Sequence, residues 1–154
     1  MELILWRHAQ AEDGTPDASR RLTARGTKDA AAVGAWLRRQ VGDEAVTVLS
    51  SPTRRTMQTA EALGIAVEPS EALGPEAQAD AVLAVAGWPA AREGVVVVVG
   101  HGPWIGQVAA RLLTGRDEPW PFAKGALWWF GWGKGDDGHA AVRLKAVLSP
   151  DLLR

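Results

Sequence analysis

The chain has 154 residues, a length that predicts one domain with a substantial buried core. Its hydrophobic content of 47% and charged content of 23% are ordinary for a globular protein, and no apolar run approaches the ~20 residues of a membrane span. The net charge of −1 argues against a general nucleic-acid binder, and the absence of cysteine excludes disulfides and thiolate catalysis. Without a signal-peptide pattern at the N-terminus, we expect one cytoplasmic domain over residues 1–154.

Strands and helices alternate in the first half of the chain. We expect a strand at residues 2–6, a polar loop at 9–21, a helix from about 24 to 40, a strand at 46–49 and a helix from about 52 to 63. Thr23 is a suitable N-cap for the first helix, and Gly42 is a suitable residue to end it. Ser51 and Pro52 have the residue types of the N-cap and first position of the second helix.

The second half continues the alternation and then ends in two strands. We expect a short edge strand at residues 65–67, a helix at 76–86, a buried strand at 95–99, a helix at 104–113 and an antiparallel hairpin of strands at 127–132 and 141–147. This order predicts an α/β fold, a three-layer sandwich with a mostly parallel central sheet. The segment between the second helix and residue 95 is already filled, which leaves no room for a cap domain. We therefore expect an open, shallow site.

Two of the three histidines directly follow predicted buried strands. The first strand runs into Arg7 and His8, and the strand of five valines runs into His101. In open α/β sheets, ligands bind beyond the carboxyl ends of the parallel strands. A third strand leads into a helix whose first turn carries Arg54 and Arg55, and a helix N-terminus with arginines attracts phosphate.

These residue types suit phosphoryl chemistry. A neutral imidazole can attack phosphorus and carry the phosphoryl group covalently, which is the role predicted for His8. Arg7, one arginine of the 54–55 pair and His101 could neutralise the equatorial oxygens, and the guanidinium groups would help to keep His8 neutral. A metal site is disfavoured, since the arginines would repel a divalent cation and no carboxylate or cysteine completes a ligand set.

Four short motifs follow one another along the chain: Arg7-His8-Ala9, LTARG at residues 22–26, SPTRRTMQT at residues 51–59, and Gly100-His101. In this order and spacing they resemble the histidine phosphatase superfamily, which has the phosphoglycerate mutase-like fold. The small size, the pattern Asp17-x-x-Arg20-x-Leu22-Thr23 and the tail from Phe122 to Pro150 resemble the SixA-type phosphohistidine phosphatase branch more narrowly. The resemblance spans nearly the whole chain.

The resemblance implies a role for each matching residue. The family's nucleophile corresponds to His8, its partner arginine to Arg7 and its second histidine to His101. Its second arginine precedes a Gln-Thr pair by three positions, which selects Arg55 over Arg54. The implied reaction forms a phosphohistidine on His8 that water hydrolyses, without metal or cofactor. The implied partner is a phosphohistidine-bearing protein, with phosphate anion as the group bound, and neither nucleic acid nor membrane is involved.

The chain departs from the broader superfamily at the proton donor. Many members carry an acidic residue after the second helix, where this chain offers Glu71, Glu76 and Asp80 outside any recognisable motif. Protonation of an ester leaving group typically contributes about 10²–10⁴-fold, whereas an N–P bond to imidazole breaks more readily. The missing acid and the missing cap therefore favour phosphohistidine on a protein over a small phosphate ester.

Two other functions remain open at this point. The same four residues could serve a broad small-molecule phosphomonoesterase, with Glu76 or Glu71 as proton donor. Alternatively, the chain could be a non-catalytic phosphate-recognition module. A complete set of two histidines and two arginines weighs against pure binding, because binding needs no nucleophile.

Three more polar residues are open to a structural as well as a functional interpretation. We interpret Ser51 as an N-cap with a secondary phosphate contact. Arg20 could bind substrate, although a salt bridge within the polar loop is the commoner role for such a residue. His139 lies in the hairpin turn and is interpreted as a solvated bystander.

Overall fold

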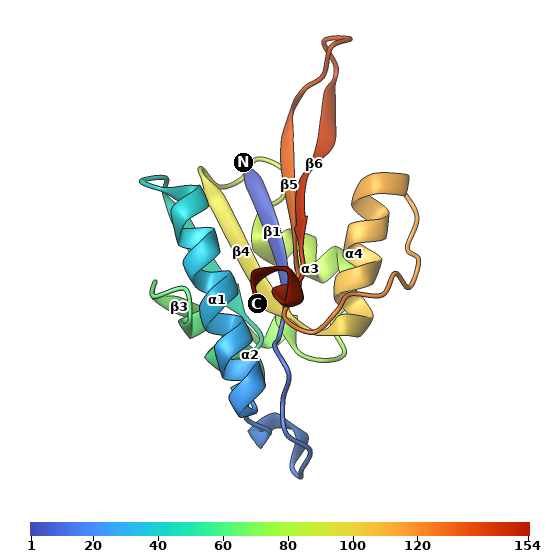
Figure 1. Cartoon of the computed structure of the whole chain (residues 1–154). Coiled ribbons are helices and arrows are strands. Elements are labelled where there is room, and N and C mark those ends of the chain that lie inside the picture. The colour runs from blue at the N-terminus through green and yellow to red at the C-terminus, as the bar shows by residue number, and fades with distance from the viewer.

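A six-stranded mixed sheet organises the molecule. The computed structural model describes residues 1–154, and its strand order is β3-β2-β4-β1-β5-β6 (Figure 1). The strands are β1 (Glu2–Arg7), β2 (Val46–Ser50), β3 (Val67–Pro69), β4 (Val95–Gly100), β5 (Leu127–Lys134) and β6 (Ala140–Leu148). The first four strands pair in parallel, whereas β5 pairs antiparallel with β1 and with β6.

Helices cover both faces of this sheet (Figure 1). They are α1 (Ala24–Val41), α2 (Arg54–Glu61), α3 (Ala79–Ala86) and α4 (Gly102–Thr114), with short 3₁₀ turns at Asp17–Ser19, Glu71–Leu73 and Pro150–Leu153. The valine strand β4 shows the two layers directly, because successive side chains point to opposite faces. Val95, Val97 and Val99 pack with apolar residues of α1 and α2, while Val96 and Val98 pack with those of α3 and α4. The predicted three-layer α/β sandwich is confirmed, and no cap domain covers the sheet.

The register of the parallel pairs aligns the functional strand ends. Arg7 at the end of β1 pairs with Gly100 at the end of β4, and Ser50 at the end of β2 pairs with Val99. The segments that follow these three strands therefore emerge at one edge of the sheet. Strand β5 runs antiparallel to β1, so the turn between β5 and β6 lies toward the opposite end of the sheet (Figure 1).

Several predicted boundaries are wrong by a few residues. The second helix begins at Arg54 with Thr53 as N-cap residue, so Ser51 and Pro52 lie outside it. The third strand lies at Val67–Pro69 rather than 65–67, and α3 begins at Ala79 rather than 76. The last of the four helices begins earlier than predicted, at Gly102, with His101 in the N-cap position.

The reason for the late start of α2 lies in hydroxyl hydrogen bonds. Thr56 Oγ1 donates to the Ser51 carbonyl oxygen at 2.8 Å and lies 2.6 Å from Thr53 Oγ1. These contacts hold an extended segment between β2 and the helix, because side chains satisfy backbone groups that a longer helix would use.

No helix of the structure combines the length and apolarity that crossing a membrane requires.

Candidate active site

His8 is buried just beyond the end of β1, with only 6% of its surface exposed. Its backbone N–H donates to the Gly100 carbonyl oxygen at 3.0 Å, which ties the residue to the end of β4. Its ring Nδ1 lies 2.8 Å from the Ala9 carbonyl oxygen. A carbonyl only accepts hydrogen bonds, so Nδ1 carries the proton and Nε2 of the neutral ring keeps its lone pair.

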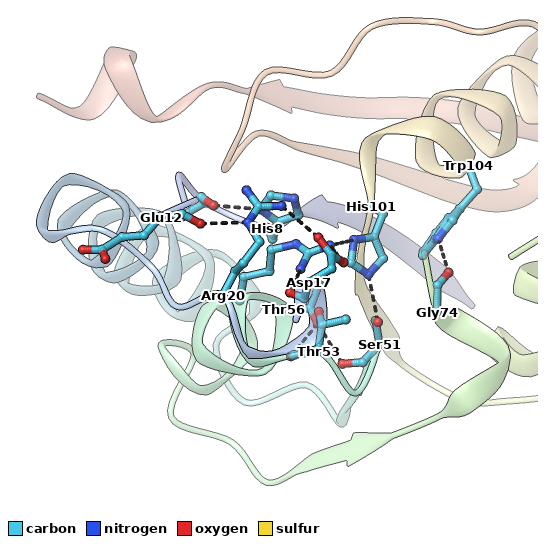
Figure 2. A network of polar contacts seen from close by, with 12 residues as sticks. His8, Glu12, Asp17, Arg20, Ser51, Thr53, Thr56, Gly74, His101 and Trp104 are labelled. Carbon is cyan, nitrogen blue, oxygen red and sulfur yellow. Dashed lines mark hydrogen bonds and ion pairs between the residues drawn. The ribbon is translucent and has the colours of Figure 1, made fainter. Parts of the chain in front are cut away.

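His101 follows β4 and faces His8 across the site, with the two ring centroids 5.7 Å apart (Figure 2). Its Nε2 lies 2.8 Å from Ser51 Oγ, and its Nδ1 lies 3.4 Å from Arg55 Nη2. Because a guanidinium only donates, Nδ1 is the acceptor and Nε2–H of the neutral ring donates to Ser51. Ser51 is fully buried, and its hydroxyl contacts His101 instead of capping α2.

Arg55 lies in the first turn of α2 and is 4% exposed. Its Nη1 donates to the Asp17 carbonyl oxygen at 2.9 Å, and its Nη2 donates to Asp17 Oδ2 at 3.0 Å. Arg55 Nε is buried without a hydrogen-bond partner. A buried unpaired N–H is costly, so a donor of this kind is well suited to a bound anion.

Arg7 approaches the same space from β1. Its Nη1 donates to the Phe122 carbonyl oxygen at 2.5 Å, and its Nε is also buried without a partner. Gly102 makes room for this guanidinium, since a Cβ atom there would stand 2.9 Å from Arg7 Cζ. The structure thus brings His8, His101, Arg55 and Arg7 to one edge of the sheet.

Burial and positive charge both act on the two histidines. Burial lowers the pKa of His8 to about 4, and the charges of Arg55, Arg7 and Lys124 act in the same direction against the hydrogen bond to Ala9. Burial also lowers the pKa of His101 to about 3, with the charge of Arg55 as the next cause. Both rings are therefore neutral at pH 7.

Hollows flank this cluster on two sides. One, of about 630 Å³, is lined by Asp17 and by residues 71–72 and 74–78, which include Glu71 and Glu76. The other, of about 260 Å³, is lined by Arg7, Gly102 and the proline-rich residues 119–122. The smaller hollow thus reaches Arg7 itself, and the larger one reaches Asp17, the partner of Arg55.

None of the remaining sequence-predicted polar residues apart from Ser51 forms a hydrogen bond or ion pair with these four. Arg20 forms an ion pair with Asp17 at 3.1 Å and donates from Nε to the Glu12 carbonyl oxygen at 2.8 Å (Figure 2). Glu71 and Glu76 are exposed along the larger hollow. The other three residues stand apart from the cluster: Asp80 pairs with Arg111, Arg54 is exposed at the start of α2, and His139 is exposed near the hairpin turn.

The sequence reasoning missed two residues that hold the cluster together. Asp17 binds the Arg55 guanidinium, and only the pattern that places it three residues before Arg20 pointed toward it. Thr59 Oγ1 accepts from the Ala9 N–H at 3.0 Å and donates to the Arg55 carbonyl oxygen at 2.8 Å. Thr59 therefore joins α2 to the turn that carries His8. Its place in the SPTRRTMQT motif was the signal available.

Taken together, the arrangement suits an anion held over a nucleophile. An imidazole nitrogen with a free lone pair lies among two arginines that each have an unpaired, buried Nε–H. Helices α2 and α4, which follow β2 and β4, begin at this edge of the sheet, and helix N-termini add positive potential. Trigonal-bipyramidal phosphoryl transfer needs this distribution of positive charge around the equatorial oxygens.

Comparisons with known proteins bear on the same arrangement. The sequence profile described as the histidine phosphatase superfamily (branch 1) matches residues 3–75. An uncharacterised protein of Picosynechococcus sp. is 34% identical over 125 residues, which cover 75% of each chain.

Solved structures match over nearly the full length. A candidate phosphohistidine phosphatase SixA from Nakamurella multipartitia is 31% identical, with a TM-score of 0.79 over 97% of this chain and 95% of that one. The protein histidine phosphatase SixA in complex with tungstate is 26% identical, with a TM-score of 0.79 over 100% of both chains. The shared fold, the family profile and these identities agree, and the chain belongs to the histidine phosphatase superfamily, within its SixA-type group.

Proposed function

We propose that this phosphatase removes phosphoryl groups from histidine side chains of proteins, without a metal ion, through a covalent phosphohistidine on His8. The observation that carries the proposal is the state of His8. Its Nδ1 proton is held by the Ala9 carbonyl, and its free Nε2 lies in a buried site with Arg7 and Arg55. A neutral imidazole fixed in this tautomer is ready to act as a nucleophile.

The first step transfers the phosphoryl group to His8. Nε2 attacks phosphorus and forms a new N–P bond, while the N–P bond to the substrate imidazole breaks and its electrons return to that ring. The substrate ring leaves as neutral imidazole when its other nitrogen carries a proton, so no acid from the enzyme is required. This fits the positions of Glu71 and Glu76, which are exposed beside the site rather than buried in it.

The proposed roles of the other three residues follow from charge. Arg7 and Arg55 would hold the equatorial oxygens through their unpaired Nε–H groups. A phosphoryl dianion would oppose the positive charges that, together with burial, lower the pKa of His101. Once protonated, Nδ1 no longer accepts from Arg55 Nη2 and would donate to a phosphoryl oxygen, while Ser51 holds the other ring nitrogen. Water attacks the phosphoenzyme in the second step, which releases phosphate and regenerates His8.

The first test compares phosphate release from a histidine-phosphorylated protein and from a phosphoserine peptide, in the presence of EDTA. Wild type is expected to act on the first substrate and to be slower on the second by about 10²–10⁴-fold, the usual contribution of leaving-group protonation. His8→Ala should be inactive. His139→Ala, which alters the exposed histidine of the hairpin, is the matched control and should retain activity.

Three outcomes would overturn parts of this proposal. Efficient hydrolysis of the ester would indicate a phosphomonoesterase, with Glu71 or Glu76 as the next residues to mutate. Activity that requires an added divalent metal would contradict the metal-free mechanism. Phosphate binding without release from either substrate would indicate a recognition module.

A further inference from the structure

Asp17 accepts two hydrogen bonds from the terminal nitrogens of the Arg55 guanidinium. The Asp17 carbonyl oxygen accepts from Nη1 at 2.9 Å, and its carboxylate accepts from Nη2 at 3.0 Å. The backbone and the side chain of one residue thus fix both terminal nitrogens. Only a narrow range of guanidinium orientations satisfies both contacts, because the arginine donors form a rigid planar fork.

The carboxylate leaves the inner part of the guanidinium free. Arg55 Nε is buried and has no partner, although Asp17 lies within reach of the same group. If the Asp17 carboxylate occupied the position of a bound phosphate, we would expect it to accept a hydrogen bond from Arg55 Nε–H as well. Asp17 instead binds Nη1 and Nη2 of Arg55, and Nε–H remains available as a donor.

Asp17 is itself held in place by a second arginine. Arg20 Nη1 donates to Asp17 Oδ1 at 3.1 Å, and Arg20 Nε donates to the Glu12 carbonyl oxygen at 2.8 Å (Figure 2). Hydrogen bonds from Arg20 and Arg55 lower the pKa of the Asp17 carboxyl, so it is ionised at neutral pH. Asp17 is more than half exposed in a 3₁₀ turn, which makes a large contribution to core packing implausible.

We propose that Asp17 is a positioning residue, which orients Arg55 so that its free Nε–H faces the phosphoryl group. The inference rests on the proposed function of the site as a phosphoryl-transfer centre. It extends the site to the polar loop before α1, which the four motif residues do not include. The negative charge of Asp17 opposes anion binding, so the proposal requires that orientation outweigh this repulsion.

The test is a titration with inorganic phosphate followed by phosphorus NMR, a method that reaches millimolar dissociation constants. Asp17→Ala is expected to weaken phosphate binding about tenfold, which corresponds to about 1.4 kcal/mol. Asp17→Asn keeps an acceptor and should stay within about threefold of wild type, as expected for one modest hydrogen bond. Asp13→Asn removes an exposed carboxylate of the same loop and serves as the matched control, with unchanged affinity.

A double-mutant cycle tests whether Asp17 acts through Arg55. In an Arg55→Gln background, Asp17→Ala should cause no further loss of phosphate affinity, because the group that it orients is gone. A merely structural role would produce the same loss in both backgrounds and would contradict the proposal. Unchanged phosphate binding by Asp17→Ala would also overturn it, as would tighter binding, which would identify Asp17 as a competing anion. Since binding needs no turnover, failure of the proposed activity would be seen separately, in the phosphate-release assay.

Discussion

At the scale of single residues, burial is the main reason why the two facing histidines stay neutral. The sequence indicated that guanidinium groups help to keep His8 neutral, and desolvation has a larger effect than these charges on both His8 and His101. A low pKa in the folded state has a thermodynamic consequence. The unfolded chain, in which histidine titrates near 6.5, binds protons that the folded chain does not.

We therefore predict that the free energy of unfolding falls as the pH drops from about 6.5 toward 4. Stability rises with pH wherever the unfolded state binds more protons, and at pH 5 each of the two histidines would cost about 2 kcal/mol relative to pH 7. Urea unfolding at pH 7 and pH 5 measures this difference. His101→Gln and His8→Asn should each reduce it, and an unchanged difference in both variants would contradict the assigned protonation states.

The predictability of individual residues depended on where they lie in the chain. His8, Arg7 and His101 directly follow strands, so the position of the strand end also places the side chain. Asp17 lies in a long polar loop, whose path is set by contacts with α2 and by the bridge between Ala11 and Leu22. No local pattern encodes such a path. Ser51 was misread for a similar reason, because its partner His101 is distant in sequence.

At the scale of elements, the turn from β4 into α4 depends on two glycines with different neighbours. A Cβ atom at Gly100 would overlap the buried Trp104 ring. A Cβ atom at Gly102 would instead stand 3.0 Å from Arg7 Nε, at the end of a flexible side chain. Glycine is therefore required at position 100 for packing against Trp104, and at position 102 to leave space for the Arg7 side chain of the site.

We predict that the two alanine substitutions affect different properties, activity in one case and stability in the other. Gly102→Ala should lower kcat/KM by displacing the Arg7 guanidinium, with little change in Tm. Gly100→Ala should lower the free energy of unfolding by about 1–3 kcal/mol, the usual cost of overpacking a core. Steady-state kinetics and thermal unfolding of both variants check this. Full activity of Gly102→Ala would mean that the observed position of Arg7 is not needed for turnover.

The type of each element, helix or strand, was more predictable from the sequence than its first and last residues. All six strands and four helices were expected, since apolar runs and helical spacing are local signals. The starts of α2, α3 and α4 were not. In α2, for instance, the hydroxyl of Thr56 holds the preceding segment extended through the Ser51 carbonyl.

At the scale of the whole molecule, the strand order is what creates the site. Strands β1 and β4 are far apart in the sequence but adjacent in the sheet, so His8 and His101 emerge side by side. The alternation of strands and helices predicted a parallel sheet, yet it could not order the strands, because many orders satisfy the same local pattern. The family resemblance, spread over nearly the whole chain, implied that fold where periodicity alone could not.

The most direct test of the account is to trap the phosphoenzyme. Wild type, mixed briefly with a histidine-phosphorylated protein and quenched in alkaline detergent, should carry a phosphoryl group on His8 that resists base and is lost in mild acid. Peptide mass spectrometry would locate it, with His8→Ala as the negative control and His139→Ala as the matched positive control. Turnover without a phosphorylated enzyme, or a phosphoryl group on another residue, would contradict the proposed mechanism.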